Sequence, residues 1–144
     1  MRNLILFAVV ILCGCVESVI YTDYTPNQVN CVGDSVCFSI KTGKRINGRI
    51  IDRTNFDILN YEYSYENGVK NGPSVEGTLI GNDMSYEKGT YLNGKKHGQF
   101  IMKPPVEFNG VSDTLITTYF QGKKKGLQKT FNYFYGRIET TVID

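Results

Sequence analysis

The chain has 144 residues, a length that suits one domain able to bury an apolar core. Ten Tyr, eight Phe and fifteen Gly, with no Trp, favour strands joined by tight turns over helices. Sixteen Lys and Arg stand against fourteen Asp and Glu, and the net charge of +2 excludes the strong basic field of a typical nucleic-acid-binding protein. We therefore expect one β-rich domain without a nucleic-acid partner, in which charge acts only locally.

The first residues have the layout of a secretory signal. Arg2 supplies a positive charge, Leu4–Leu12 is an unbroken apolar run, and the small residues Cys13–Cys15 follow directly. A membrane-spanning helix needs roughly 20 apolar residues, and this run is much shorter. We therefore predict that residues 1–14 are a signal peptide and take no part in the fold.

The end of this signal, Leu12-Cys13-Gly14-Cys15, resembles the lipobox of bacterial lipoproteins, in which signal peptidase II cuts before a cysteine that receives diacylglycerol. Leu12 and Gly14 fit the pattern, whereas Cys13 stands where Ala or Ser is usual. The resemblance implies lipid, palmitate included, on Cys15, a lipidated linker over residues 15–30 and a place in the cell envelope. An ordinary signal cut near Ser18, which gives a secreted protein, and an uncleaved anchor remain alternatives.

Two further cysteines, Cys31 and Cys37, remain as a pair under either form of export. An oxidising compartment would let them form a disulfide. Gly33-Asp34 between them is a turn signal flanked by β-branched residues, so a hairpin could bring the sulfurs together. A metal or redox pair is the alternative, although the spacing is not C-x-x-C.

An internal repeat organises the rest of the chain. Residues 65–72, 91–98 and 119–126 align without gaps as Y-x-[N/Q]-G-x-x-x-G, and the first Gly recurs after 26 residues (68 to 94) and 28 residues (94 to 122). Asn-Gly favours positive φ and tight reversal, so each copy predicts a β-hairpin. The predicted turn glycines are Gly68, Gly72, Gly94, Gly98, Gly122 and Gly126. A looser copy spans residues 41–48, and a truncated one residues 133–136.

Segments rich in aromatic and β-branched residues flank these turns at 61–65, 115–120 and 138–142, and we interpret them as strands with one buried face. No segment has a sustained helical period. The sequence therefore predicts an all-β domain over residues 31–144, an elongated single-layer antiparallel meander of repeated β-hairpins in which each hairpin packs mainly on its neighbours.

The repeated units resemble the MORN-repeat family, in particular a bacterial antitoxin-type (YwqK-like) variant, over roughly residues 38–140; residues 91–98 are the copy most like the family. That family usually carries an aromatic residue two positions after the second Gly. Only Phe100 fulfils this here, and Ser74 and Gln128 replace it elsewhere. Pro104-Pro105 predicts an insertion around residues 103–113. The resemblance implies a MORN-like sheet that binds or scaffolds a partner, while a toxin-neutralising role does not suit an exported chain.

No catalytic or phosphate-binding motif is found, and the acidic residues are scattered. The single histidine, His97, lies between lysines and Gly98, which predicts an exposed turn residue. We therefore expect neither an enzyme nor a bound metal or cofactor.

Two surfaces are candidates for binding. The turns carry basic residues that stacked hairpins would place on one edge, as an anion-binding ridge for acidic protein, glycan or lipid: Lys44, Arg45, Lys70, Lys95, Lys96, Lys123, Lys124 and Lys125. Tyr61, Tyr63 and Tyr65 share one strand face and could contact a partner. Both also have a plainer interpretation, as soluble turns and as half-buried sheet residues.

Taken together, the sequence predicts a non-catalytic binding or scaffold module, exported and held to the membrane by its N-terminal lipid, with a protein or an anionic glycan or lipid as its partner. The alternatives are a secreted effector or immunity-type protein that binds another protein, and an envelope hydrolase that uses scattered carboxylates.

Overall fold

The computed structural model describes residues 21–33, 36–54, 58–80, 83–104, 114–132 and 135–143. This part of the chain is built from strands and one turn of 3-10 helix. In chain order they are β1 (Thr22–Tyr24), η1 (Pro26–Gln28), β2 (Val29–Val32), β3 (Val36–Ser39), β4 (Gly48–Arg53), β5 (Leu59–Glu66), β6 (Val69–Ile80), β7 (Asp83–Leu92), β8 (Lys95–Lys103), β9 (Thr114–Phe120), β10 (Lys123–Asn132) and β11 (Arg137–Ile143).

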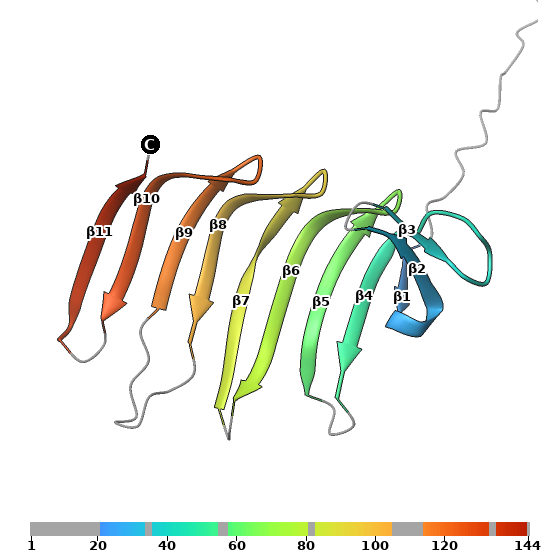
Figure 1. Ribbon diagram of the computed structural model, residues 1–144, viewed down its shortest axis with the longest axis horizontal. Coiled ribbons are helices and arrows are strands. Elements are labelled where there is room, and N and C mark those ends of the chain that lie inside the picture. Colours follow the sequence, from blue (N-terminus) through green and yellow to red (C-terminus); the bar gives the residue numbers. More distant parts are fainter. Residues whose placement is uncertain are drawn as a thin grey trace, which may run out of the picture.

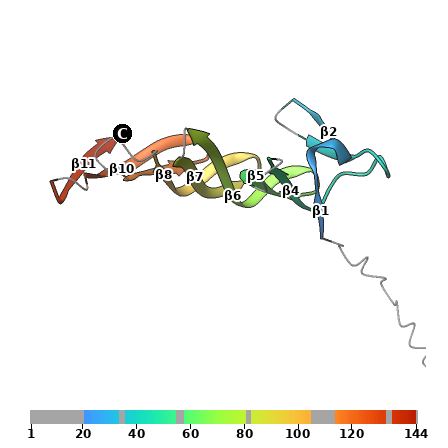
Figure 2. The ribbon, with the colours of Figure 1, turned by 90° about the horizontal axis from the view of Figure 1, so that it is seen from below.

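Nine of these strands form one long sheet in the order β1-β4-β5-β6-β7-β8-β9-β10-β11 (Figure 1). From β4 to β11 each strand pairs antiparallel with the next along the chain, and the sheet is a single layer for most of its length (Figure 2). The predicted all-β meander of repeated hairpins is confirmed.

The repeated segments form the three turns that the sequence predicts, between β5 and β6, β7 and β8, and β9 and β10. Both central residues of each turn have positive φ, at 49° and 78° for Asn67 and Gly68 and at 49° and 85° for Gln121 and Gly122. This is the type I′ geometry that matches the twist of the strands. All three turns lie at the same end of the strands, at the top of Figure 1, and we call this side of the sheet the turn edge.

Backbone hydrogen bonds link successive turns. The N–H of Gly68 donates to the carbonyl of Ile46 at 2.7 Å, that of Gly94 to Lys70 at 2.8 Å, and that of Gly122 to Lys96 at 2.8 Å. Ile46 thus accepts the same hydrogen bond as Lys70 and Lys96 do in the later units. The last three residues of the looser copy, 46–48, therefore occupy the same structural positions as the last three of a full copy.

The ends of the array differ from the sequence prediction in two respects. β1, η1 and the start of β2 lie within residues 15–30, so the sheet begins inside the predicted linker: Thr22 in β1 pairs parallel with Gly48 in β4. Gly136, in the predicted truncated copy, directly precedes β11, which begins at the opposite end of the strands from the three turns (Figure 1). Residues 1–20, 105–113 and 133–134, which include the predicted signal peptide and most of the predicted insertion, lie outside the described residues.

The β2–β3 hairpin folds over one face of the sheet at its N-terminal end (Figure 2). Its Cys31 and Cys37 are directly paired and joined by a disulfide, with their Cα atoms 4.0 Å apart. The N–H of Cys37 donates to the carbonyl of Gly68 at 2.8 Å. Under the hairpin lies a small core formed by Cys37, Ile46, Ile50 and Tyr65, and Ile46 is 0% exposed.

Candidate binding face

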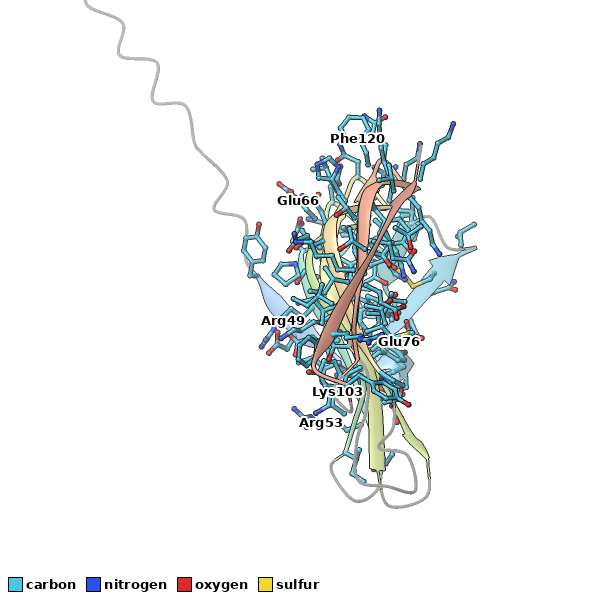
Figure 3. All side chains as sticks on the ribbon, turned by 90° about the vertical axis from the view of Figure 1, so that its left-hand side faces the viewer. Arg49, Arg53, Glu66, Glu76, Lys103 and Phe120 are labelled. Carbon is cyan, nitrogen blue, oxygen red and sulfur yellow. A yellow bond between two sulfur atoms is a disulfide. The ribbon has the colours of Figure 1, made fainter. Side chains whose placement is uncertain are left out.

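We call the sheet face under this hairpin the inner face. Direct cross-strand pairs place on it the row Ile50, Tyr63, Ser74 and Gly89, and, further along, the pair Phe100 and Thr117. Glu76 lies on this side together with the disulfide, and Arg49 lies on the opposite side, the outer face (Figure 3).

A row of aromatic rings crosses the inner face. The ring centroids of Tyr61 and Tyr63 are 5.3 Å apart, those of Tyr63 and Tyr91 6.0 Å, those of Tyr91 and Phe100 5.7 Å, and those of Phe100 and Tyr119 5.2 Å. The last three contacts are T-shaped, an arrangement that aromatic pairs prefer. The row joins β5, β7, β8 and β9 into one surface.

Small residues make room for these rings. A Cβ on Gly89 would lie 2.5 Å from ring atoms of Phe100, so the ring of Phe100 occupies the space above Gly89. Ser74 is the direct partner of both Tyr63 and Gly89, and its hydroxyl donates to the carbonyl of Gly89 at 3.3 Å. Ser74 departs from the aromatic residue of the repeat pattern, and Tyr63 on the paired strand supplies a ring there instead.

Two lysines lie across the row. Lys70 Nζ is 3.7 Å from the ring centroid of Tyr63 and 5.3 Å from that of Tyr91. Lys96 Nζ is 4.6 Å from the centroid of Phe100 and 5.4 Å from that of Tyr119. Ammonium groups at these distances are attracted to the faces of the rings, while their carbon chains cover apolar surface.

Carboxylates complete the polar groups of this face. The hydroxyl of Tyr63 donates to Glu76 at 2.5 Å, and Lys96 pairs with Glu87 at 2.5 Å. Burial raises the pKa of Tyr63, and the hydrogen bond to Glu76 raises it further. Burial lowers the pKa of Lys96, but the hydrogen bond and charge of Glu87 outweigh it, and the pKa is raised overall. At neutral pH these groups therefore present neutral phenols and paired charges.

A groove of about 320 Å³ lies where the β2–β3 hairpin overhangs the start of the aromatic row. It is lined on the hairpin side by Val29 and Cys31, and on the sheet side by Ile50, Tyr61, Tyr63 and Lys70, among others. Of the tyrosines proposed as a partner face, Tyr61 and Tyr63 are half-buried in this groove, whereas Tyr65 is 6% exposed and belongs to the core.

The proposed basic ridge divides between two surfaces. Lys70 and Lys96 lie over the inner-face rings, and Lys124 pairs with Tyr119 on the same side. Arg45 and Lys95 stay at the turn edge, each beside the glycine of the next turn. The Cβ of Arg45 would be 3.2 Å from a Cβ added to Gly68, and the Cβ of Lys95 would be 3.6 Å from a Cβ added to Gly122. Val69 holds the equivalent position beside Gly94, and its Cγ1 would be 3.4 Å from a Cβ added to that glycine. Lys44, Arg45, Lys95, Lys123, Lys124 and Lys125 are exposed. An anion-binding edge remains a prediction for these residues other than Lys124, which lies on the inner face.

The outer face carries an ion-paired arginine near the N-terminal edge. Arg49 donates to Asp23 at 2.6 and 2.9 Å and to Glu62 at 2.8 Å. The hydrogen bond from Arg49 lowers the pKa of Asp23. Asp23 also lines an open depression of about 570 Å³ together with Asp52, and Asp52 accepts a hydrogen bond from Asn60 at 3.0 Å. Both carboxylates thus accept hydrogen bonds from neighbouring side chains.

The surroundings of His97 differ from the sequence prediction. His97 lies in β8, half-buried, with its ring centroid 5.4 Å from that of Phe120. Its Nδ1 is buried and makes no hydrogen bond within the described part of the chain. The two preceding copies carry Asn at this position. Asn47 Oδ1 accepts the N–H of Asn67 at 2.7 Å, and Asn71 Oδ1 accepts that of Asn93 at 3.2 Å. The repeat register could have revealed this equivalence.

In comparisons with known proteins, no family model matches the sequence, and neither a curated protein nor a solved structure does. The MORN resemblance is therefore a prediction that rests on the repeats alone. Within the described residues, no group of three or more His, Cys, Asp or Glu side chains is placed to hold a metal ion. Over the same ranges, no helix is long and apolar enough to cross a membrane. Cys15, the predicted lipid site, lies outside them.

Proposed function

We propose that this protein is an exported, lipid-anchored and non-catalytic module that binds a partner protein on the inner face of its sheet. The observation that carries the proposal is the row of half-buried tyrosines, with Lys70 and Lys96 across it, which starts in the groove beneath the hairpin. Tyr is enriched at protein interfaces because it combines a large rigid ring with a polar tip.

The chemistry of this face suits a protein surface of mixed character. Rings provide apolar contact area, while Lys96 with Glu87, and Tyr63 with Glu76, provide paired polar groups at the rim. The MORN resemblance and the lipobox-like Cys15 support a scaffold role at the cell envelope. A free secreted protein that binds a partner through the same face is the alternative if Cys15 carries no lipid.

The location is tested by the mass of the N-terminal peptide from the native membrane fraction. A diacylated or triacylated Cys15 is the expected result. A peptide that starts near Val19 without lipid would replace the anchored protein with a secreted one and leave the binding face untouched.

The binding face is tested with a partner recovered by cross-linking in the envelope. Replacement of Tyr91 and Tyr119 by Ala is expected to weaken binding of that partner at least tenfold, whereas Arg49→Ala on the outer face leaves it within twofold. The opposite order of effects would contradict the proposal. Binding that instead falls steeply with salt and with Lys95→Ala would assign the turn edge to an anionic glycan or lipid.

A further inference from the structure

The two outermost strands of the long sheet, β1 and β11, differ in how well they are protected from pairing with a further strand. At the N-terminal edge, β1 pairs with β4 over only three residues, and Pro26 follows at the start of η1. A short edge strand followed by Pro is one way in which proteins prevent further strand pairing. At the other edge, β11 pairs with β10 through seven residues, from Arg137 to Ile143. Within the described residues, no strand pairs with the outer edge of β11.

β11 is also the most solvent-exposed strand of the sheet. Residues 137–142 are all exposed. Ile138 and Val142 are 65% and 67% exposed and lie on the same face of the strand. Ile138 pairs directly with Phe131 of β10, which is itself 37% exposed. Among the described strands, β11 therefore presents an unpaired edge bordered by an apolar stripe.

The sequence of β11 is complementary to itself when it is read in the opposite direction. About Thr140, an antiparallel second copy places Ile138 against Val142, Thr140 against Thr140, and Glu139 against Thr141. Each of these pairs keeps apolar with apolar or polar with polar, and only the outermost pair of the strand, Arg137 against Ile143, is mixed. The edge contains neither Pro nor Lys, the residues that commonly block such pairing.

We propose that two copies of this chain associate through β11, antiparallel and in register about Thr140. The contact is isologous, because each residue meets its counterpart under a two-fold axis. Ile138 of one copy then packs beside Phe131 of its own β10 and Val142 of the second copy. With the axis perpendicular to the sheet, the inner faces of both copies point in the same direction.

The test exchanges charges at the two positions that oppose each other across the axis. Full-length chains with two different affinity tags are coexpressed, and co-purification in mild detergent is measured. Ile138→Lys with Val142→Lys places like charges opposite each other, as does Ile138→Glu with Val142→Glu. Ile138→Lys with Val142→Glu places opposite charges there and is neutral overall. Circular dichroism checks that each exposed-site variant keeps its fold.

We expect the unmodified chain and the Lys/Glu variant to associate with themselves, and the Lys/Lys and Glu/Glu variants to lose at least tenfold of this signal. Mixing the Lys/Lys chain with the Glu/Glu chain is expected to restore it. A monomeric unmodified chain would overturn the proposal. Equal co-purification of all variants would also overturn it, because association would then lie elsewhere, for example at the N-terminal segment.

Discussion

The N-terminal end of the sheet, which we call the capped end because the β2–β3 hairpin covers it, and the rest of the sheet, which is uncapped, shield apolar side chains from water in two different ways. The residue two positions before the second Gly of each unit lies on the inner face. Beneath the β2–β3 hairpin it is Ile46, which is completely buried. At the margin of the hairpin it is Lys70, which lines the groove, and further along the sheet it is Lys96, and both ammonium groups lie over aromatic rings. A single-layer sheet must shield its rings from water, and either a second layer or the carbon chain of a lysine can do so. The residue type at this one position thus reports whether a unit is covered.

A large loss of stability is expected from removing an apolar side chain from the core under the β2–β3 hairpin. Ile46→Ala removes the one fully buried large side chain of the core under the hairpin and should lower the free energy of unfolding by about 2–4 kcal/mol. Chemical denaturation followed by circular dichroism measures the change. Lys70→Ala, at the equivalent position of the next unit, is the matched control; its side chain is only half-buried, and its loss should cost less than about 1 kcal/mol. Equal losses would show that the cap adds no special stability.

A second variant tests the uncapped row, where small residues admit large rings. Gly89→Val places a side chain into the space that the ring of Phe100 occupies, and overpacking of this kind costs about 1–3 kcal/mol. Thermal unfolding measures the loss. Phe100→Ala alone costs about 3–5 kcal/mol, but the double variant should lose less than the sum of the two single losses, since the ring is the group that clashes. If the double variant is less stable by the sum of both single effects, the two residues do not compete for this space.

Alkaline pH tests the half-buried phenol of Tyr63, in the groove under the hairpin. The raised pKa of Tyr63 means that the folded state holds its phenol proton more tightly than the unfolded state. Stability should therefore be unaffected below about pH 10, where both states are protonated, and should fall as pH rises above that value. Denaturation midpoints between pH 8 and 11 measure this slope. Tyr63→Phe should reduce it, whereas a slope unchanged by the substitution would place its origin in other groups.

The smallest effect is expected at His97, the repeat position at which the two preceding units carry an asparagine. His97→Asn restores the residue that accepts the next turn's N–H in both preceding units. One such hydrogen bond should add about 0.5–1.5 kcal/mol of stability. Differential scanning calorimetry is sensitive enough to detect it. Asn71→His, the reverse exchange in the preceding unit, should lose a similar amount. A loss of stability in His97→Asn, or none in Asn71→His, would refute the equivalence of these positions.

The hairpins were predictable from the sequence because their cause is local. Asn-Gly at residues 67–68 and 93–94 requires a tight reversal whatever surrounds it, so the strands and turns followed from their spacing. The β2–β3 hairpin and its disulfide were predicted from the cysteine pair and the turn signal between them. Their position over the sheet was not predictable, since the parallel pairing of Thr22 with Gly48 joins segments with no shared pattern. The placement of Lys70 and Lys96 over rings was missed for a related reason: a lysine in a turn motif indicates solvent, and only the register of the paired strands turns it towards Tyr91 and Phe100.

The hydrogen bonds between turns give the array a direction. In every link the later turn donates to the earlier unit, from Gly68 to Ile46, from Gly94 to Lys70 and from Gly122 to Lys96. Each hairpin is thus fastened to its predecessor, and the first fastening point lies beside the disulfide-closed hairpin. An inner turn therefore takes part in two such links, one to each neighbouring unit, and damage to it should loosen the units on both sides, while damage to the last of these turns weakens one link only.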